Sequence, residues 1–178
     1  MNAPQLGTLD WHDLATTTEL VAAPVAAAAP PGPAWVAPID AELADTAAFC
    51  ERYQVPLGAS ANCVIVEGRR GEQTTHAAVL VLATHRADVN KTVRKHLGVR
   101  KISFAPMETA TSLTGMEYGG ITPIGLPADW PVLVDEAVAA AGPVVIGAGV
   151  RAAKIMIDGA DLARLPGAEV LALAQPTD

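Results

Sequence analysis

The chain has 178 residues, of which 51% are hydrophobic and only 4% are aromatic. This length is enough for one well-buried core and too short for two ordinary domains. The scarcity of aromatic side chains argues against a sequence-tolerant platform for single-stranded nucleic acid. The formal net charge of −7 argues against wholesale non-specific binding of DNA.

Residues 1–33 are expected to form a leader that precedes the main domain at 34–178. Residues 10–14 predict the start of a short helix, with Trp11 and Leu14 docking on the body, and the proline-rich residues 30–33 predict a stiff linker. The apolar run 20–33 contains four prolines and no Lys or Arg precedes it, unlike a secretory signal or a spanning helix. We therefore expect a cytoplasmic protein with no membrane contact.

The next segment predicts an extended strand at 35–39, followed by one helix of about a dozen residues that ends near Tyr53. Asp40 is expected to cap this helix, and its buried stripe would carry Leu43, Ala47 and Cys50. Two apolar runs follow, at 62–67 and 76–83, separated by a turn at 68–72. This pattern predicts a β-hairpin whose strands are buried on both faces.

A basic segment follows the hairpin. Asp88 is expected to cap a helix that ends at Gly98, with Val89, Val93 and Leu97 facing inward. Residues 69–101 contain eight Lys and Arg residues and two acidic residues, a local net charge of +6. Such an island is typical of a contact with a polyanion, although a solvated helix face accounts for it equally well.

The second half of the chain alternates short strands with short helices. Strands are predicted at 102–104, 131–135, 143–146, 154–157 and 169–173, and helical turns at 107–113 and 160–165. This irregular order favours an α+β fold, a single domain with a mixed β-sheet flanked by helices, over a regular βαβ series.

Several common chemistries are not indicated. The two cysteines, Cys50 and Cys63, are isolated in apolar surroundings and are interpreted as small buried hydrophobes, and the histidines lack the spacing of metal ligands. Residues 147–152 match a dinucleotide-binding fingerprint, but a strand and a turn are expected to follow, where that fingerprint needs a helix. There is no nucleophile elbow of a serine hydrolase. We expect no cofactor and no metal.

The most informative stretch is residues 114–125, TGMEYGGITPIG, which holds four glycines and one proline. Glycine permits close approach to the backbone, so the amides of Gly119, Gly120 and Ile121 are expected to converge on an anion or a carbonyl oxygen. On composition alone, a tight turn between strands accounts for the same residues.

This stretch resembles the signature loop of the YbaK/ProX family, the freestanding relatives of the editing domain of prolyl-tRNA synthetase. Residues 97–102, 132–135, 149–151 and 159–162 resemble further elements of that family in the same order, so the likeness covers roughly the last two thirds of the chain. The resemblance implies the fold of that editing domain. It also implies hydrolysis of a mischarged aminoacyl-tRNA, such as cysteinyl- or alanyl-tRNA for proline.

The resemblance also implies roles for individual residues. Catalytic roles would fall to Asn62, Gly119, Gly120 and Asp135. The substrate would contact Thr114, Ile121, Thr122, Pro123, Gly125 and Arg151. The phosphates of the tRNA acceptor end would meet Arg86, Lys91, Arg94 and Lys95. Besides tRNA, prolyl-tRNA synthetase and a second copy of the chain are candidate partners, whereas DNA and membranes are not.

Asn62 departs from the family pattern, because the family usually carries a lysine at this position of the first hairpin strand. An asparagine can form hydrogen bonds but cannot supply a charge. Three hypotheses follow: an active deacylase of altered specificity, a non-catalytic module that binds tRNA or a synthetase, and an esterase acting on another acyl ester, such as a small molecule.

Overall fold

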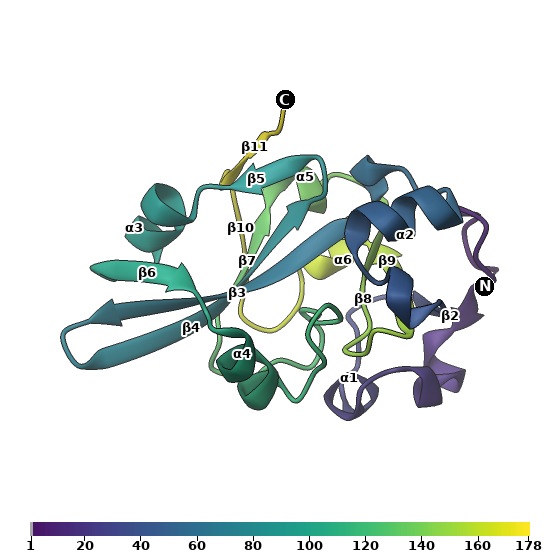
Figure 1. Cartoon of the computed structure of the whole chain (residues 1–178), viewed down its shortest axis with the longest axis horizontal. Coiled ribbons are helices and arrows are strands. Elements are labelled where there is room, and N and C mark those ends of the chain that lie inside the picture. The colour runs from purple at the N-terminus through teal and green to yellow at the C-terminus, as the bar shows by residue number, and fades with distance from the viewer. Residues whose placement is uncertain (1) are drawn as a thin grey trace.

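The computed structural model describes residues 2–178 and contains three β-sheets with short helices around them (Figure 1). The first sheet is antiparallel and has the order β1 (His12–Asp13), β2 (Ala34–Pro38), β9 (Ala153–Asp158) and β8 (Pro143–Gly147). A small third sheet pairs β11 (Ala174–Pro176) with β5 (His85–Ala87).

The second sheet is mixed and has five strands. Its order is β10 (Ala168–Leu171), β7 (Val132–Asp135), β4 (Gln73–Leu82), β3 (Ala61–Arg70) and β6 (Lys101–Phe104). β10 and β4 run parallel to β7, whereas β3 is antiparallel to both β4 and β6. A single bridge between Ser60 and Val145 connects the start of β3 with β8 of the first sheet.

The helical segments are short. The α-helices are α1 (Ala23–Ala27), α2 (Thr46–Tyr53), α3 (Arg94–His96), α4 (Met107–Thr114), α5 (Glu136–Ala139) and α6 (Gly159–Leu162). Single helical turns are η1 (Leu14–Thr16), η2 (Thr18–Leu20), η3 (Ala41–Leu43) and η4 (Leu57–Ala59), and the π-type turn η5 (Val89–Val93) runs directly into α3. The expected α+β fold class is confirmed.

The core is divided by the five-stranded sheet. On one face, Leu80 and Val134 belong to a cluster with Ile155 of the first sheet. On the other face, Val79 and Leu133 pack with Val93 of η5. The central strands β4 and β7 are therefore buried on both faces. The prediction of two-face burial for the hairpin is confirmed for β4 from Ala77 onward and is wrong for β3, whose residues 62–64 are only half-buried.

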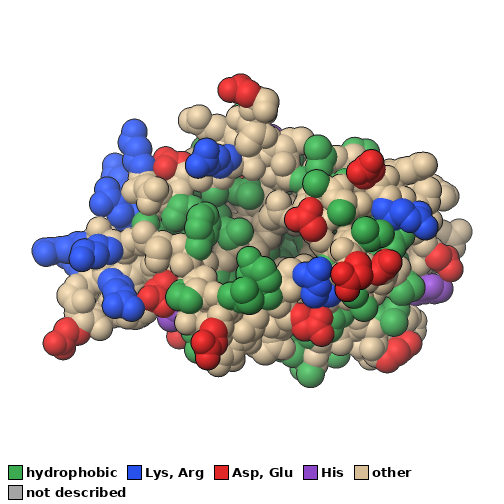
Figure 2. All heavy atoms as spheres, in the orientation of Figure 1, with side chains coloured by type: hydrophobic (Ala, Val, Ile, Leu, Met, Phe, Trp, Pro, Cys, Tyr) green, Lys and Arg blue, Asp and Glu red, His purple; other side chains and the backbone are tan. Residues whose placement is uncertain are grey.

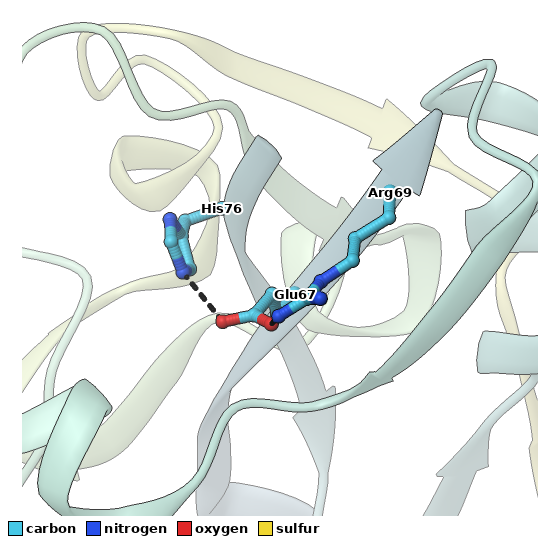
Figure 3. A network of polar contacts seen from close by, with 3 residues as sticks. All are labelled: Glu67, Arg69 and His76. Carbon is cyan, nitrogen blue, oxygen red and sulfur yellow. Dashed lines mark hydrogen bonds and ion pairs between the residues drawn. The ribbon is translucent and has the colours of Figure 1, made fainter. Parts of the chain in front are cut away.

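The predicted hairpin is confirmed and is longer than expected, since β3 and β4 pair in register from Ala61 with Leu82 to Arg70 with Gln73. Figure 1 shows this hairpin extending to the left, with β6 beside it and α3 above. On its outer half Glu67 lies between Arg69 and His76 (Figure 3), at 3.0 Å and 3.1 Å respectively. His76 also stacks on Trp130, with ring centroids 5.4 Å apart, so this network fastens the hairpin to the segment before β7.

The prediction of one helix from Asp40 to Tyr53 was wrong. Asp40 caps only the turn η3, and Asp45 caps α2 by accepting a hydrogen bond from the Ala47 amide. Two capping aspartates five residues apart divide the segment, because each satisfies the free amides of its own first turn. Phe49 and Cys50 are the buried residues of α2, and Ala47 is exposed. The break leaves backbone carbonyls of residues 41–44 outside a regular helix.

The leader also differs from the expected short helix at 10–14. His12 and Asp13 form β1 against β2, and helical structure starts only at Leu14. Leu14 and Val25 are buried in the main core, and Trp11 packs against the cluster around Phe49. Within residues 2–178 no helix is long and apolar enough to cross a membrane.

Candidate functional site

A pocket of about 510 Å³ opens where several segments meet. One wall is the first half of β3, including Asn62 and Cys63, and another is the segment 44–46 between η3 and α2. Further walls come from the loop after α4, at Gly119 and Ile121, from the β8–β9 connection with Arg151, and from the end of β6 at Phe104. The volume lies within the usual range of small-ligand sites.

The glycines of residues 115–125 allow this loop to pack against the β8–β9 connection. The Gly149 amide donates to the Gly120 carbonyl at 2.7 Å, and the Glu117 amide donates to the Gly149 carbonyl at 2.8 Å. A Cβ atom at Gly120 would lie 2.6 Å from the backbone carbonyl of Val150, and one at Gly147 would lie 2.6 Å from the Ile121 carbonyl. These glycines are therefore required for the stacking of two backbone segments.

The sequence predicted that three loop amides would converge on a ligand. The Gly120 amide is already used, because it donates to the Glu117 carbonyl at 3.0 Å. The amides of Gly119 and Ile121 have no hydrogen-bond partner within residues 2–178, and both residues line the pocket. Two of the three predicted amides are thus left without a partner among the described residues.

Arg151 fastens the loop to the opposite side of the pocket. Its backbone amide donates to the Glu117 carboxylate at 2.7 Å. Its guanidinium donates to the Tyr118 carbonyl at 3.4 Å and to the Ala41 carbonyl of η3 at 3.0 Å. The predicted substrate-binding residue therefore lines the pocket and also holds two of its walls together.

A second cation in the pocket, Lys154 of β9, was missed by the sequence analysis. Its side chain is 8% exposed, its Nζ donates to the Ala44 carbonyl at 3.1 Å, and Nζ lies 5.1 Å from the centroid of the Phe49 ring. Burial lowers the pKa of Lys154, and Arg151 lowers it further, while Cys50 and Asp45 act in the opposite direction. The sequence did contain one indication of this site, because Lys154 is the single charged residue in the strand predicted at 154–157, and the other three residues of that strand are apolar.

Asn62 lies on the β3 wall, where its Oδ1 accepts a hydrogen bond from the Thr46 hydroxyl at 2.6 Å. The neighbouring Cys63 also lines the pocket. Cys63 is only half-buried by its solvent-accessible surface, but desolvation of the thiol raises the pKa of Cys63 to about 12. Its thiol is therefore protonated and a weak nucleophile at neutral pH. The prediction of buried cysteines is confirmed for Cys50 and is wrong for Cys63, which is only partly buried.

Several predicted site residues lie outside the pocket wall. Asp135 is 1% exposed and accepts hydrogen bonds from the amides of Ala137, Leu173 and Ala174, at 3.2, 3.1 and 3.0 Å, so it caps α5 and holds the following chain. We therefore do not retain Asp135 in the site. The Thr114 hydroxyl donates to the Ala110 carbonyl at 2.7 Å and closes the end of α4.

The last predicted residues of the loop are also structural. The Thr122 hydroxyl is buried without a partner among the described residues, and Thr122 and Pro123 are absent from the pocket lining. Gly125 has a φ of +82°, and a Cβ atom there would collide with the Pro24 backbone of α1. This end of the loop therefore packs on the leader.

Two of the four predicted phosphate-binding residues, Arg94 and Lys95, belong to an exposed basic surface. We use this name for the cluster of Arg69, Arg70, Arg94, Lys95, Arg100 and Lys101. Arg69 pairs with Lys101 across β3 and β6, and the Arg94 guanidinium donates to the Arg100 carbonyl at 3.4 Å. Figure 2 shows Lys and Arg side chains gathered at the left end of the molecule, over α3, β6 and the hairpin tip. Lys91 lies one turn before α3 and Arg86 on β5, both exposed.

Two exposed aromatic side chains line the pocket. Phe104, at the end of β6, is 63% exposed and Tyr118, in the loop, is 57% exposed. Although aromatic residues are scarce in the chain, two of them thus stand at this site with accessible rings. Within residues 2–178 no group of three or more His, Cys, Asp or Glu side chains is placed to hold a metal ion.

Known proteins share this fold. The chain is similar in structure to a protein proposed to be a trans-editing enzyme for prolyl-tRNA synthetase, with 23% identity and a TM-score of 0.68 over 79% of this chain and 85% of that one. It is similar to the hypothetical protein APE2540, with 21% identity and a TM-score of 0.67 over 78% and 86% of the two chains. Residues 40–165 match the family model of the aminoacyl-tRNA editing domain. The chain belongs to the aminoacyl-tRNA editing domain family.

Proposed function

We propose that this protein is a trans-editing deacylase that hydrolyses a mischarged aminoacyl-tRNA, with cysteinyl- and alanyl-tRNA for proline as its first candidate substrates. Membership of the editing family supports this reaction class. The observation that carries the proposal is the pocket, which is lined by Gly119 and Ile121, whose amides have no partner among the described residues, and by two cationic residues, Arg151 and Lys154.

The reaction would be the hydrolysis of an ester. Water adds to the carbonyl carbon, the carbonyl oxygen takes up the electron pair as an oxyanion, and the bond to the ribose oxygen then breaks. The proton lost by water ends on the ribose oxygen, so the products are a free amino acid and a tRNA with a free hydroxyl. Amides and cations fixed in place before the reaction stabilise such an oxyanion, and an activated ester needs little else.

The same geometry suggests how the tRNA would approach. The faces of Phe104 and Tyr118 suit the stacking of the terminal adenine at the pocket. The basic surface offers exposed cations to the phosphates farther along the acceptor arm. In this arrangement the acyl group enters the pocket while the backbone of the tRNA follows β6 toward α3.

The proposal is tested by single-turnover deacylation of a panel of mischarged tRNAs, with the spontaneous hydrolysis of each ester subtracted. We expect acceleration of at least one small aminoacyl ester on tRNA for proline and none for correctly charged prolyl-tRNA. A matched control is Arg52→Met, which removes an exposed cation of α2 outside the pocket lining. A wild-type protein that accelerates no ester in the panel would overturn the proposal.

A second candidate function is a non-catalytic module that binds tRNA or a synthetase. The observation in its favour is Asn62, whose amide supplies no charge and whose Oδ1 is occupied by the Thr46 hydroxyl. A tRNA-binding titration beside the deacylation panel separates the two functions. Tight binding without hydrolysis of any ester would favour the module, whereas hydrolysis of small aryl or alkyl esters without tRNA binding would favour an esterase.

A further inference from the structure

Lys154 is a buried ammonium in a position that the packing of the core alone does not explain. The other four described residues from Ala153 to Ile157 are apolar and at most 1% exposed. Burying an ammonium group is costly unless partners replace its water. Its only hydrogen bond within residues 2–178 is the one to the Ala44 carbonyl, although an ammonium has three N–H groups.

The strand register places Lys154 beside the glycine loop. Lys154 pairs with Gly147 of β8, and paired residues of antiparallel strands project on the same face of the sheet. The space that a side chain at Gly147 would fill is taken by the carbonyls of Gly120 and Ile121. Lys154 therefore projects on the face where the loop with the two partnerless amides is packed, and all of Gly119, Ile121 and Lys154 line the pocket.

The segment 44–46 connects Lys154 with Asn62. The Ala44 carbonyl accepts a hydrogen bond from Lys154, and two residues later the Thr46 hydroxyl donates to Asn62. The break between η3 and α2 makes the first of these contacts available, because it releases Ala44 from a continuous helix. Lys154 and Asn62 thus reach the pocket from two different strands, and both are hydrogen-bonded to the segment 44–46.

We propose that Lys154 is a catalytic residue of this pocket, whose ammonium contacts the carbonyl oxygen of the scissile ester and stabilises the negative charge that develops there. This inference rests on the proposed deacylase function and adds to it a residue on β9 that acts with the amides of Gly119 and Ile121. The ammonium keeps its proton throughout. The charge it opposes appears when water adds to the carbonyl carbon and disappears when the ribose oxygen departs.

The test is single-turnover deacylation by Lys154→Met, which keeps the length of the side chain and removes its charge. The plateau rate at saturating tRNA is expected to fall about 100-fold, the usual effect of losing one oxyanion-stabilising group, while the concentration of tRNA at half-saturation stays within about threefold. Arg52→Met is the matched control with an unchanged rate. Circular dichroism and a melting curve establish that both variants are folded.

Two further variants separate a charge effect from a structural one. Lys154→Arg keeps a cation and is expected to retain more activity than Lys154→Met. Adding Asn62→Lys to Lys154→Met returns an ammonium to the pocket from the β3 wall, and we expect a partial recovery of the plateau rate. A role limited to holding Ala44 in place predicts no recovery, because an ammonium at position 62 starts from a different strand.

The pH profile supplies an independent readout. Only the ammonium form stabilises the oxyanion, so the enzymatic rate, corrected for spontaneous hydrolysis, is expected to fall as the pH rises through the pKa of Lys154. Burial places that pKa below the ordinary 10.5; the charged and titratable groups that bear on it are Arg151, Cys50 and Asp45. In Lys154→Arg the fall is expected to be absent, since a guanidinium does not lose its proton in this range.

The outcomes distinguish this inference from the proposed function. An active wild type together with a folded Lys154→Met variant of equal plateau rate would overturn the role of Lys154 and leave the deacylase intact. A wild type that accelerates no ester would overturn both. A 100-fold loss with recovery by Asn62→Lys and a changed pH profile would establish Lys154 as a catalytic residue.

Discussion

The pocket and the basic surface both carry positive charge, but they hold it in different ways. In the pocket, Arg151 and Lys154 are tied to backbone carbonyls of residues 41–44, and Lys154 is almost fully buried. On the basic surface, Arg94 and Lys95 are exposed on a three-residue helix. Buried, fixed charges act on a reacting group at close range, whereas exposed charges mainly attract a polyanion. We therefore expect substitutions in the two regions to change different kinetic quantities.

The largest effect is expected from Arg151→Ala. This change removes the two guanidinium contacts that hold the Tyr118 and Ala41 carbonyls, and the loop would lose its fixed distance from η3. Because small displacements of catalytic groups are costly, we expect the single-turnover plateau rate to fall about 100-fold. The tRNA concentration at half-saturation should change far less. Arg52→Ala serves as the control. An unchanged plateau rate would show that Arg151 is not needed for the hydrolysis step.

Reversal of Arg94 and Lys95 to Glu should act on binding instead. We expect the dissociation constant for tRNA to rise by more than about tenfold at low salt, and the salt dependence of binding to flatten by about one unit for each phosphate that the variant no longer neutralises. Arg52→Glu reverses a charge on α2, outside the basic surface, and should leave the slope unchanged. An equal slope in the double variant would indicate that α3 is only a solvated helix face.

Phe104→Ala tests the exposed ring at the end of β6. If the terminal adenine stacks on this ring, removal of the ring should raise the tRNA concentration at half-saturation by about tenfold. Such a change lies within the usual stacking contribution of ~1–3 kcal/mol per base. Met107→Ala removes a similarly exposed side chain of α4 that does not line the pocket. Equal effects of the two substitutions would argue against stacking on Phe104.

The smallest effect is expected from Asn62→Ala. Loss of the hydrogen bond with the Thr46 hydroxyl should loosen the β3 wall and reduce the plateau rate by about fivefold, equivalent to ~1 kcal/mol for one neutral hydrogen bond. Thr46→Ala removes the other partner and should have a similar effect, with little added loss in the double variant. Strictly additive losses would show that the two side chains act independently.

The sequence predicted the fold better than the site, because the elements of the fold depend on residues that are neighbours in the sequence. The hairpin of β3 and β4, the cap at Asp88 and the glycine turn at Gly98 each depend on neighbouring residues, and all three are confirmed. The helix predicted from Asp40 was wrong because a second cap at Asp45 competes with its continuation. Because Asp40 and Asp45 each cap their own helical turn, Ala44 lies between the two turns, and this fixes the position of its carbonyl.

The site was only partly predictable because its residues meet through long-range strand pairing. Gly119, Ile121 and Arg151 were identified by their motifs, and they do line the pocket. Asp135 resembled a site residue in sequence, but its carboxylate caps α5 at the Ala137 amide and also accepts hydrogen bonds from the distant Leu173 and Ala174 amides, which no local pattern reveals. Lys154 enters the pocket only because β9 pairs with β8 in a register that places it opposite Gly147.

The most direct test of the account is single-turnover deacylation of mischarged tRNA for proline as a function of tRNA concentration, for the wild type, Lys154→Met and Arg94→Glu/Lys95→Glu. We predict a wild-type plateau well above spontaneous hydrolysis, a lower plateau with the same half-saturation for Lys154→Met, and a weaker half-saturation with the same plateau for the charge reversal. A wild type without a plateau above spontaneous hydrolysis, or two variants that change the same quantity, would contradict the account.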